Sequence, residues 1–231
     1  MSSAPYPDDP DIASLARAEI GAKVSGKLRR NPMISTIANE KMEIFVRHGF
    51  LTPAECTGMM ARIDAGSMPS KLFSESADGG YRTSSSCNLD PDDPLVRKLT
   101  GRVDALTGYA TALGETIQGQ HYAAAQEYKS HCDYFPKAVR YWPDMRDAGG
   151  QRCWTAMMYL NPVEEGGETH FVRAGFMVPP RAGTLLVWNN MQADGSPNAE
   201  TLHAALPVVR GVKYVLTKWY RERPWAAVRI R

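Results

Sequence analysis

The sequence predicts a mainly β fold, a sandwich or barrel of short strands braced by helices. Helical patterns occupy the first half of the 231 residues, whereas beyond Thr116 the chain changes to short β-type runs broken by Gly, Pro and Asn. The length lies within the range of a single domain, and an apolar content of 43% is enough for a sizeable core.

The N-terminal segment predicts a tail followed by one helix. The first ten residues, rich in Pro, Ser and Asp, are expected to be mobile. Asp11 can cap a helix whose apolar stripe is formed by Ile12, Leu15, Ala16, Ile20, Val24 and Leu28. We expect this helix to pack on the domain, with a homodimer contact as the alternative. The chain therefore divides into residues 1–35, a tail and an amphipathic helix, and residues 36–231, a single domain.

Two further helices are expected before the β-rich half. A short apolar run, Met42–Val46, predicts a strand that leads into a helix over Pro53–Asp64. Thr52 and Glu55 form a capping box at its start, with Pro at the first helical position. The next helix is expected to begin near Pro94 and to bury a stripe formed by Val96, Leu99, Val103 and Leu106.

Seven runs in the second half have the length and composition of strands. They are Ile117–Tyr122, Gln126–His131, Trp154–Leu160, Glu168–Phe171, Thr184–Trp188, Leu202–Leu206 and Lys213–Tyr220. Two segments rich in Gly, Asp, Asn and Pro, Asp144–Gln151 and Met191–Glu200, predict mobile loops that could act as lids.

Charge and apolar patterning exclude several partners. The 27 basic and 25 acidic side chains leave a formal charge of +2, so no global field attracts DNA, RNA or an anionic membrane. No apolar run approaches the roughly 18 residues of a membrane span, and the first residues lack the order of a signal peptide. The cysteines are scattered and are expected to be free thiols in a reducing compartment: Cys56, Cys87, Cys132 and Cys153. We therefore expect a cytoplasmic protein with no nucleic-acid or membrane partner.

The most informative pattern is His131-Cys132-Asp133, followed by His203 and then Lys213. On a strand, residues two apart point to the same face, so His131 and Asp133 can converge on one metal while Cys132 faces away. Two histidines and one carboxylate are the ligand set of the non-haem Fe(II) oxygenases. An HxD tripeptide also occurs by chance, and a zinc hydrolase could use the same ligands, but neither alternative gives Lys213 a role.

A longer set of motifs lies in order between roughly Glu43 and Arg223. The set comprises Tyr122, Gln126–Phe135, Gln151-Arg152, Met158–Asn161, Gly166–Thr169, His203, Lys213 and Lys218-Trp219. It resembles the prolyl 4-hydroxylase-type 2-oxoglutarate- and Fe(II)-dependent dioxygenases. The resemblance implies a double-stranded β-helix, a jelly-roll or cupin-like fold. The chain departs from the family at Ala123-Ala124-Ala125, where a Gly-containing turn is common.

The resemblance also implies roles for nine residues. Those expected to hold Fe(II) are His131, Asp133 and His203. Those expected to bind the distal carboxylate of 2-oxoglutarate are Lys213, Tyr122 and Thr169. Those expected to line the substrate space are Tyr128, Arg152 and Trp219, although Arg152 could instead be a structural ion-pair partner and Trp219 a core residue. O2 would be the oxidant, and ascorbate is a candidate reductant.

The implied activity is hydroxylation of an unactivated C–H bond with release of succinate and CO2, and the expected substrate is a prolyl residue in a peptide or protein. A free amino acid or another small metabolite is the alternative, and a closed pocket would favour it over a peptide. A non-catalytic jelly-roll that binds a metal or ligand is a remote alternative, because a retired site commonly loses a ligand. Nucleic-acid demethylation fits less well, because the charge is balanced and the expected co-substrate cation is a lysine.

Overall fold

The computed structural model describes residues 8–70 and 81–226, so the predicted mobile tail lies mostly outside the described residues. The strands of the large sheet are β1 (Ser35–Thr36), β2 (Ile44–Arg47), β3 (Met68–Pro69), β4 (Ser85–Asn88), β5 (Gln118–Tyr122), β7 (Arg152–Tyr159), β11 (Leu185–Asn189) and β14 (Lys213–Arg221). Those of the small sheet are β6 (Tyr128–His131), β9 (Thr169–Phe171), β10 (Phe176–Val178) and β12 (His203–Ala205). A separate pair is formed by β8 (Glu165–Gly166) and β13 (Val208–Arg210).

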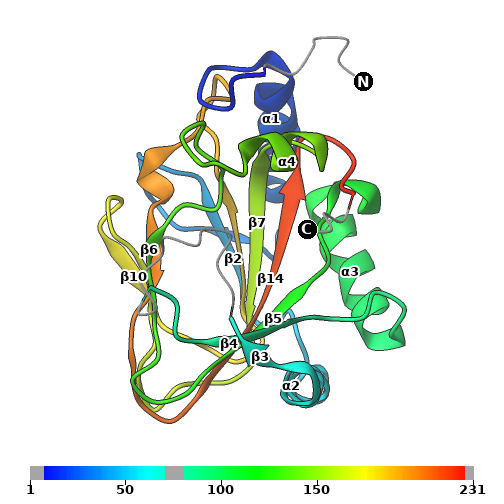
Figure 1. Ribbon diagram of the computed structural model, residues 1–231. Coiled ribbons are helices and arrows are strands. Elements are labelled where there is room, and N and C mark those ends of the chain that lie inside the picture. Colours follow the sequence, from blue (N-terminus) through cyan, green and yellow to red (C-terminus); the bar gives the residue numbers. More distant parts are fainter. Residues whose placement is uncertain (1–7, 71–80, 227–231) are drawn as a thin grey trace.

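The large sheet has the strand order β1-β2-β11-β7-β14-β5-β4-β3, and the small sheet has the order β10-β9-β12-β6. The pairings in both sheets are antiparallel. In Figure 1 the small-sheet strands β6 and β10 lie to the left of the large sheet, and the helices α2 and α3 lie to its right. Each of the seven predicted runs contains a strand, and the predicted sandwich braced by helices is confirmed.

The helices are α1 (Leu15–Arg29), α2 (Pro53–Gly66), α3 (Pro94–Thr107) and α4 (Trp142–Asp147), with 3-10 turns η1 (Thr111–Leu113) and η2 (Ala199–Thr201). The capping box predicted for α2 is present, because the Thr52 side chain accepts from the Glu55 N–H and the Glu55 carboxylate accepts from the Thr52 N–H. The predicted start of α1 is wrong. Ser14, not Asp11, caps this helix, so Ile12 stays outside it.

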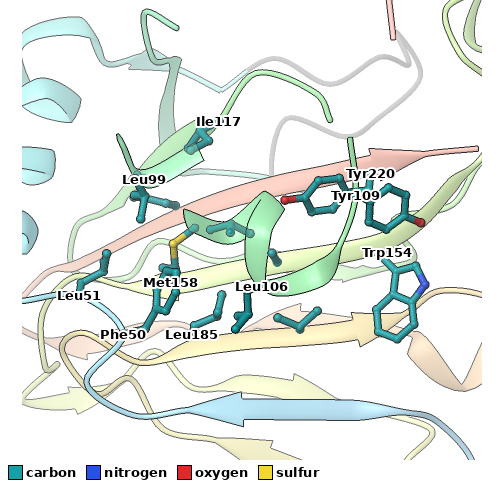
Figure 2. Close-up of a cluster of buried hydrophobic side chains, with 14 of the residues drawn as sticks. Phe50, Leu51, Leu99, Leu106, Tyr109, Ile117, Trp154, Met158, Leu185 and Tyr220 are labelled. Atoms are coloured by element: carbon teal, nitrogen blue, oxygen red, sulfur yellow. The ribbon is translucent and has the colours of Figure 1, made fainter. Parts of the chain in front are cut away.

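Two apolar cores lie on the two faces of the large sheet. Along β7, Trp154 and Met158 face the core on the helix side, whereas Met157 and Tyr159 belong to the core between the sheets. The helix-side core continues into α3 through Leu99 and Leu106, as Figure 2 shows. This alternation follows from the period of two along a strand. It means that every second side chain of β7 and β14 points into the space between the sheets.

The two segments predicted to be mobile loops are both held by contacts with the rest of the domain. Asp144–Gln151 contains the second half of α4 and a buried turn, whose glycines are needed because Gly150 has a φ of +75° and lies against the Glu222 carboxylate. Met191–Glu200 is docked on the start of α1, where the Ser14 N–H donates to the Asp194 carbonyl at 2.9 Å. Neither segment lines the cavity described below, and a role of either as a lid stays a prediction.

The N-terminal helix α1 packs on the same core as the large sheet. Val24 and Leu28 are buried in the helix-side core, with exposed fractions of 3% and 0%. The Arg17 guanidinium is buried beside the Glu222 carboxylate, with 3.5 Å between the nearest nitrogen and oxygen. The predicted packing of this helix on the domain is therefore confirmed. Within the two described ranges, no helix has the length and apolarity needed to cross a bilayer.

Candidate metal centre and co-substrate cavity

Two neighbouring strands of the small sheet bring the three predicted metal ligands together. His131 ends β6 and lies directly opposite His203, the first residue of β12. Asp133 lies just beyond the end of β6, and not on the strand as the HxD spacing had predicted. Its two carboxylate oxygens are each 3.9 Å from one histidine Nε2. The three candidate ligand atoms lie within 4.8 Å of one another, so the triad could hold one divalent metal.

Backbone carbonyls fix the protonation of both imidazoles. The Nδ1 atom of His131 lies 2.8 Å from the Lys129 carbonyl, and the Nδ1 atom of His203 lies 2.9 Å from the Thr201 carbonyl. Because a carbonyl oxygen only accepts, each Nδ1 carries the proton and each Nε2 presents a lone pair to the triad. Burial, reinforced by the neighbouring His203, lowers the pKa of His131 to about 3. The His131 ring is therefore neutral at pH 7, as a metal ligand requires.

Asp133 stays ionised although it is buried, with an exposed fraction of 5%. Burial acts to raise the pKa of this carboxyl group, but the two histidines, the Arg152 guanidinium and a hydrogen bond from Thr155 together hold it below its usual value. The Thr155 hydroxyl donates to Oδ2 of Asp133 at 2.7 Å. The triad thus offers two imidazole Nε2 atoms and one negative carboxylate as donor groups.

A cavity between the sheets joins the triad to the buried end of β14. The fourteen lining residues are Gln120, Tyr122, Tyr128, His131, Asp133, Met157, Thr169, Trp188, His203, Ala205, Lys213, Val215, Thr217 and Trp219. The space not filled by atoms is about 400 Å³, including the part that opens to solvent. The cavity brings together eight of the nine residues singled out in the sequence, all except Arg152.

Lys213 is a buried cation with no counter-charge bound to it. Its exposed fraction is 1%, and within the described ranges no ion pair or hydrogen bond engages its ammonium group. The ammonium lies 5.3 Å from the centre of the Tyr122 ring and 5.8 Å from that of Tyr159. Burial lowers the pKa of Lys213 to about 7, and the charge of Glu168 only partly opposes this effect. An anionic ligand would satisfy this group.

The hydroxyl groups of Thr169 and Tyr122, which line the cavity together with Lys213, each lie close to another side chain. The Tyr159 hydroxyl lies 2.7 Å from the Thr169 Oγ1 atom and 3.2 Å from the Val178 carbonyl, which can only accept. The Tyr122 hydroxyl donates to the Gln120 side-chain oxygen at 2.8 Å. A ligand that accepts from Tyr122 would have to replace this bond.

Of the three residues expected to line the substrate space, Tyr128 and Trp219 line the cavity and Arg152 does not. Tyr128 stacks on His131 with 3.6 Å between ring centres, and Trp219 also lines the cavity. Arg152 lies behind Trp219, with its guanidinium carbon 3.9 Å from the indole centre. It makes two hydrogen bonds to Glu115, at 2.6 and 2.8 Å. The structure therefore places Arg152 as an ion-pair partner, the alternative considered from the sequence, and not on the cavity wall.

Several lining or supporting residues were missed in the sequence. Thr217 lies between Val215 and Trp219 on the inward face of β14, and Gln120 lies two residues before Tyr122 on β5. The period of two could have identified both once Lys213 and Tyr122 were placed. Thr155, which binds Asp133, and Trp188, which lies edge-on to the His203 ring at 5.2 Å, had no comparable signal.

Sequence comparison finds similar proteins over most of the chain. A family model described as the 2OG-Fe(II) oxygenase superfamily matches residues 117–221. Probable prolyl 4-hydroxylase 8 of Arabidopsis thaliana is 33% identical, over 76% of this chain and 67% of the relative. Probable prolyl 4-hydroxylase 3 of the same plant is 31% identical, over 90% and 79%. Prolyl 4-hydroxylase subunit alpha-1 of Rattus norvegicus is 37% identical over 62% of this chain, which covers only 27% of that relative.

Structural comparison gives the same class of fold. The viral collagen prolyl hydroxylase of Paramecium Bursaria Chlorella virus-1, solved as a 2OG complex, aligns with a TM-score of 0.60 at 23% identity and covers 84% of this chain and 98% of the other. A Trichoplax adhaerens prolyl hydroxylase, solved with a hypoxia inducible factor oxygen degradation domain peptide fragment, aligns with a TM-score of 0.59 at 16% identity and covers 89% and 90%. At these identities the likeness is one of fold, and it confirms the predicted double-stranded β-helix.

Proposed function

Because this chain belongs to the prolyl 4-hydroxylase family of 2-oxoglutarate- and Fe(II)-dependent oxygenases, we propose that it hydroxylates a prolyl residue in a peptide or protein and releases succinate and CO2. The observation that carries this proposal is one cavity that contains both a His131, Asp133 and His203 triad and an unpaired buried Lys213. A metal site alone would also suit a hydrolase. The buried cation beside it gives a dicarboxylate co-substrate a place to bind.

The triad fits Fe(II). Two Nε2 lone pairs and one carboxylate are the donor set of this class of iron site, and hydrogen bonds hold both imidazoles in the required tautomer. When bound, the iron supplies the redox chemistry that couples oxidative decarboxylation of 2-oxoglutarate, with O2 as oxidant, to the transfer of one oxygen atom to a C–H bond. Ascorbate is the proposed reductant that would keep the metal in its ferrous form.

The Lys213 end of the cavity fits the distal carboxylate of 2-oxoglutarate. The Lys213 ammonium would form a charge-assisted hydrogen bond to this carboxylate, and the Thr169 hydroxyl, which lies next to that of Tyr159, would donate a second bond. Tyr122 would contribute a third if its hydroxyl turned away from Gln120. With these contacts the protein holds the keto-acid end of the co-substrate towards the triad.

Aromatic side chains provide the proposed site for the prolyl ring. Tyr128 and Trp219 line the cavity near the triad, and such rings would hold a pyrrolidine by apolar contact. Arg152 would act here by fixing the Trp219 indole against its guanidinium. A peptide substrate is supported by the names of the relatives and by the structural neighbour solved with a peptide fragment. A free amino acid or small metabolite, the alternative from the sequence, is not favoured by these relatives.

Anaerobic reconstitution with Fe(II), followed by exposure to O2 with 2-oxoglutarate, tests the proposal. Proline-containing peptides and free proline are offered side by side, and succinate and the mass gain of one oxygen atom are followed. Succinate formed together with a hydroxylated peptide is the expected result. Hydroxylation of free proline alone would favour the metabolite alternative, and no consumption of 2-oxoglutarate despite bound iron would contradict the proposal.

We further place the enzyme in the cytoplasm, which the free thiols of all four cysteines support. A homodimer through the N-terminal helix is the other proposal carried from the sequence. The apolar side of α1 is used within its own chain, where Val24 and Leu28 are buried, so a dimer contact would have to use the exposed side of the helix.

A further inference from the structure

Two of the three candidate metal ligands, Asp133 and His203, are connected by a series of hydrogen bonds that are linked to one another through the covalent structure of Asn190, Asn198 and Thr201. None of the connecting residues lines the cavity. We propose that Thr155 and Asn190 are positioning residues that hold Asp133 in register with His203. This inference rests on the proposed function, because it concerns how the metal site is held. Neither residue belongs to the set of nine that the sequence singled out.

The first hydrogen bonds of this series connect the Asp133 carboxylate to Asn190. The Thr155 hydroxyl donates to Oδ2 of Asp133 at 2.7 Å, and the Asn190 Nδ2 group donates to the Thr155 Oγ1 atom at 2.9 Å. The direction of both bonds is fixed by chemistry. An ionised carboxylate only accepts, so the single hydroxyl proton of Thr155 is committed to Asp133, and Asn190 must present its N–H group to Thr155. Thr155 and Asn190 both have an exposed fraction of 0%.

The remaining hydrogen bonds of this series connect Asn190 to His203 along the segment between β11 and β12. The Asn198 N–H donates to the Asn190 carbonyl at 2.9 Å, and the Thr201 hydroxyl donates to the Asn198 carbonyl at 2.7 Å. The Thr201 carbonyl then accepts from the Nδ1 atom of His203 at 2.9 Å. Asn190 is thus the residue at which the path to the aspartate meets the path to the histidine.

His131 is held in a different way. Its Nδ1 atom is hydrogen-bonded to the Lys129 carbonyl of its own strand, and this bond is not part of the series that connects Asp133 to His203. Asp133, in contrast, lies beyond the end of β6, where no strand pairing fixes its backbone. The bond from Thr155 is therefore the contact that fixes the rotation of its carboxylate. Thr155 binds Oδ2, whereas Oδ1 accepts no hydrogen bond from the described residues and is free for a cation.

Binding of Mn2+ in the absence of 2-oxoglutarate tests the inference without relying on turnover. Thr155→Val removes the hydroxyl with almost no change of shape, Thr155→Ser keeps it, and Asn190→Leu removes the donor behind it. Thr184→Val is the matched control, because Thr184 is also buried and its hydroxyl bonds to His48, away from the triad. The Mn2+ affinity is measured by electron paramagnetic resonance, and the Tm of the metal-free protein reports on folding.

The expected result is a loss of Mn2+ affinity of about tenfold or more in Thr155→Val, the size typical of residues that orient metal ligands. Thr155→Ser should stay within about threefold of the unaltered protein, and Thr184→Val should bind Mn2+ normally even if its Tm falls. Asn190→Leu should weaken binding, and adding it to Thr155→Val should cause little further loss because Asn190 acts through Thr155.

Unchanged Mn2+ affinity in Thr155→Val would overturn the inference, as would losses in the double variant that equal the product of the two single losses. If Asn190→Leu does not fold, the comparison of Thr155→Val with Thr155→Ser decides the question by itself. Failure of the unaltered protein to bind Mn2+ is a distinct outcome, because it would remove the metal site on which the proposed function also depends.

Discussion

Lys213 shows how burial prepares a single residue for its role. The side chain is surrounded by aromatic rings and has no acidic partner bound to it within the described residues, and burial lowers its pKa to about 7. A buried cation without a counter-ion is costly in a protein made only for stability. Burial of the unpaired Lys213 ammonium lowers the stability of the ligand-free protein, and binding of an anionic ligand compensates for this loss. Lys213 therefore contributes to ligand binding at a cost in stability.

Lys213→Ala should raise the KM for 2-oxoglutarate by about 10- to 100-fold, because a hydrogen bond to a charged group contributes about 1.5–3 kcal/mol. The Mn2+ affinity of the triad should change much less, since Lys213 is not a candidate ligand. Steady-state kinetics and Mn2+ titration measure the two effects. Lys23→Ala, at an exposed position of α1, is the control. An unchanged KM in Lys213→Ala would mean that another group binds the distal carboxylate.

The affinity for 2-oxoglutarate should also depend on pH. The pKa of Lys213 in the ligand-free protein is about 7, and a bound carboxylate favours its charged form, so the pKa rises on binding. Below pH 7 the ammonium is already charged and contributes no pH dependence. Above pH 7 binding must take up a proton, and this group should weaken the affinity by about tenfold per pH unit until the pKa of the complex is reached. Calorimetry at pH 8 in two buffers with different ionisation enthalpies would show proton uptake, and its absence would contradict this assignment.

At this scale the sequence predicted the residues that carry charge or metal-ligand chemistry, because their types and spacing are informative. His131, Asp133, His203 and Lys213 all line one cavity. Residues that act by contact alone could not be predicted. For Arg152 a structural ion pair was an alternative from the sequence, but its partner Glu115 is distant in the chain, and only the folded structure brings the two together.

At the scale of the elements, the site depends on strands that are buried on both faces. β7 is buried along its whole length, and β14 is buried at all but one position. The runs that contain β7, β11 and β14 were found because such buried strands are rich in apolar residues. Short strands such as β3 and β10 were missed because two or three residues leave no period. The argument from the HxD motif placed both ligands on one strand, whereas the strand ends at His131 and Asp133 lies beyond it.

The turn before β6 contains the departure from the family noted in the sequence. Ala125 has a φ of 64°, in the left-handed region that disfavours residues with a Cβ atom. Ala125→Gly should therefore leave the free energy of unfolding unchanged or raise it by up to about 1 kcal/mol. Ala22→Gly, at an exposed position inside α1, should lower it by about 1 kcal/mol. Urea unfolding of both variants checks the contrast, and an equal loss in the two would show that Ala125 is not strained.

At the scale of the whole molecule, the helices support the face of the large sheet opposite the site. Residues of α1, α2 and α3 share one apolar core with β7, β11 and β14. Figure 2 shows the part of this core that contains Leu99 and Leu106 of α3. The other face of the same strands carries the cavity. The sheet is thus packed against helices on one face, and its other face presents polar groups to the cavity. The fold class followed from composition and strand runs, whereas the docking of Met191–Glu200 on α1 depends on backbone contacts that no sequence pattern reveals.

Leu28→Ala tests how firmly α1 belongs to this core. Leu28 is fully buried, so the change should lower the free energy of unfolding by about 2–5 kcal/mol. Leu15→Ala, on the same helix with an exposed fraction of 65%, should change it by less than about 0.5 kcal/mol. Denaturant unfolding measures both. Similar small effects in the two variants would indicate that the helix is not docked in solution.

The central claim is that the triad carries the oxygenase chemistry of this molecule, and Asp133→Ala tests it most directly. The purified variant and the unaltered protein are compared, with Fe(II), O2, 2-oxoglutarate and a proline-containing peptide, for the joint appearance of succinate and hydroxylated peptide. The account predicts both products from the unaltered protein and neither from Asp133→Ala, with the Tm of the metal-free variant showing that it is folded. Full formation of both products by the variant would contradict the account.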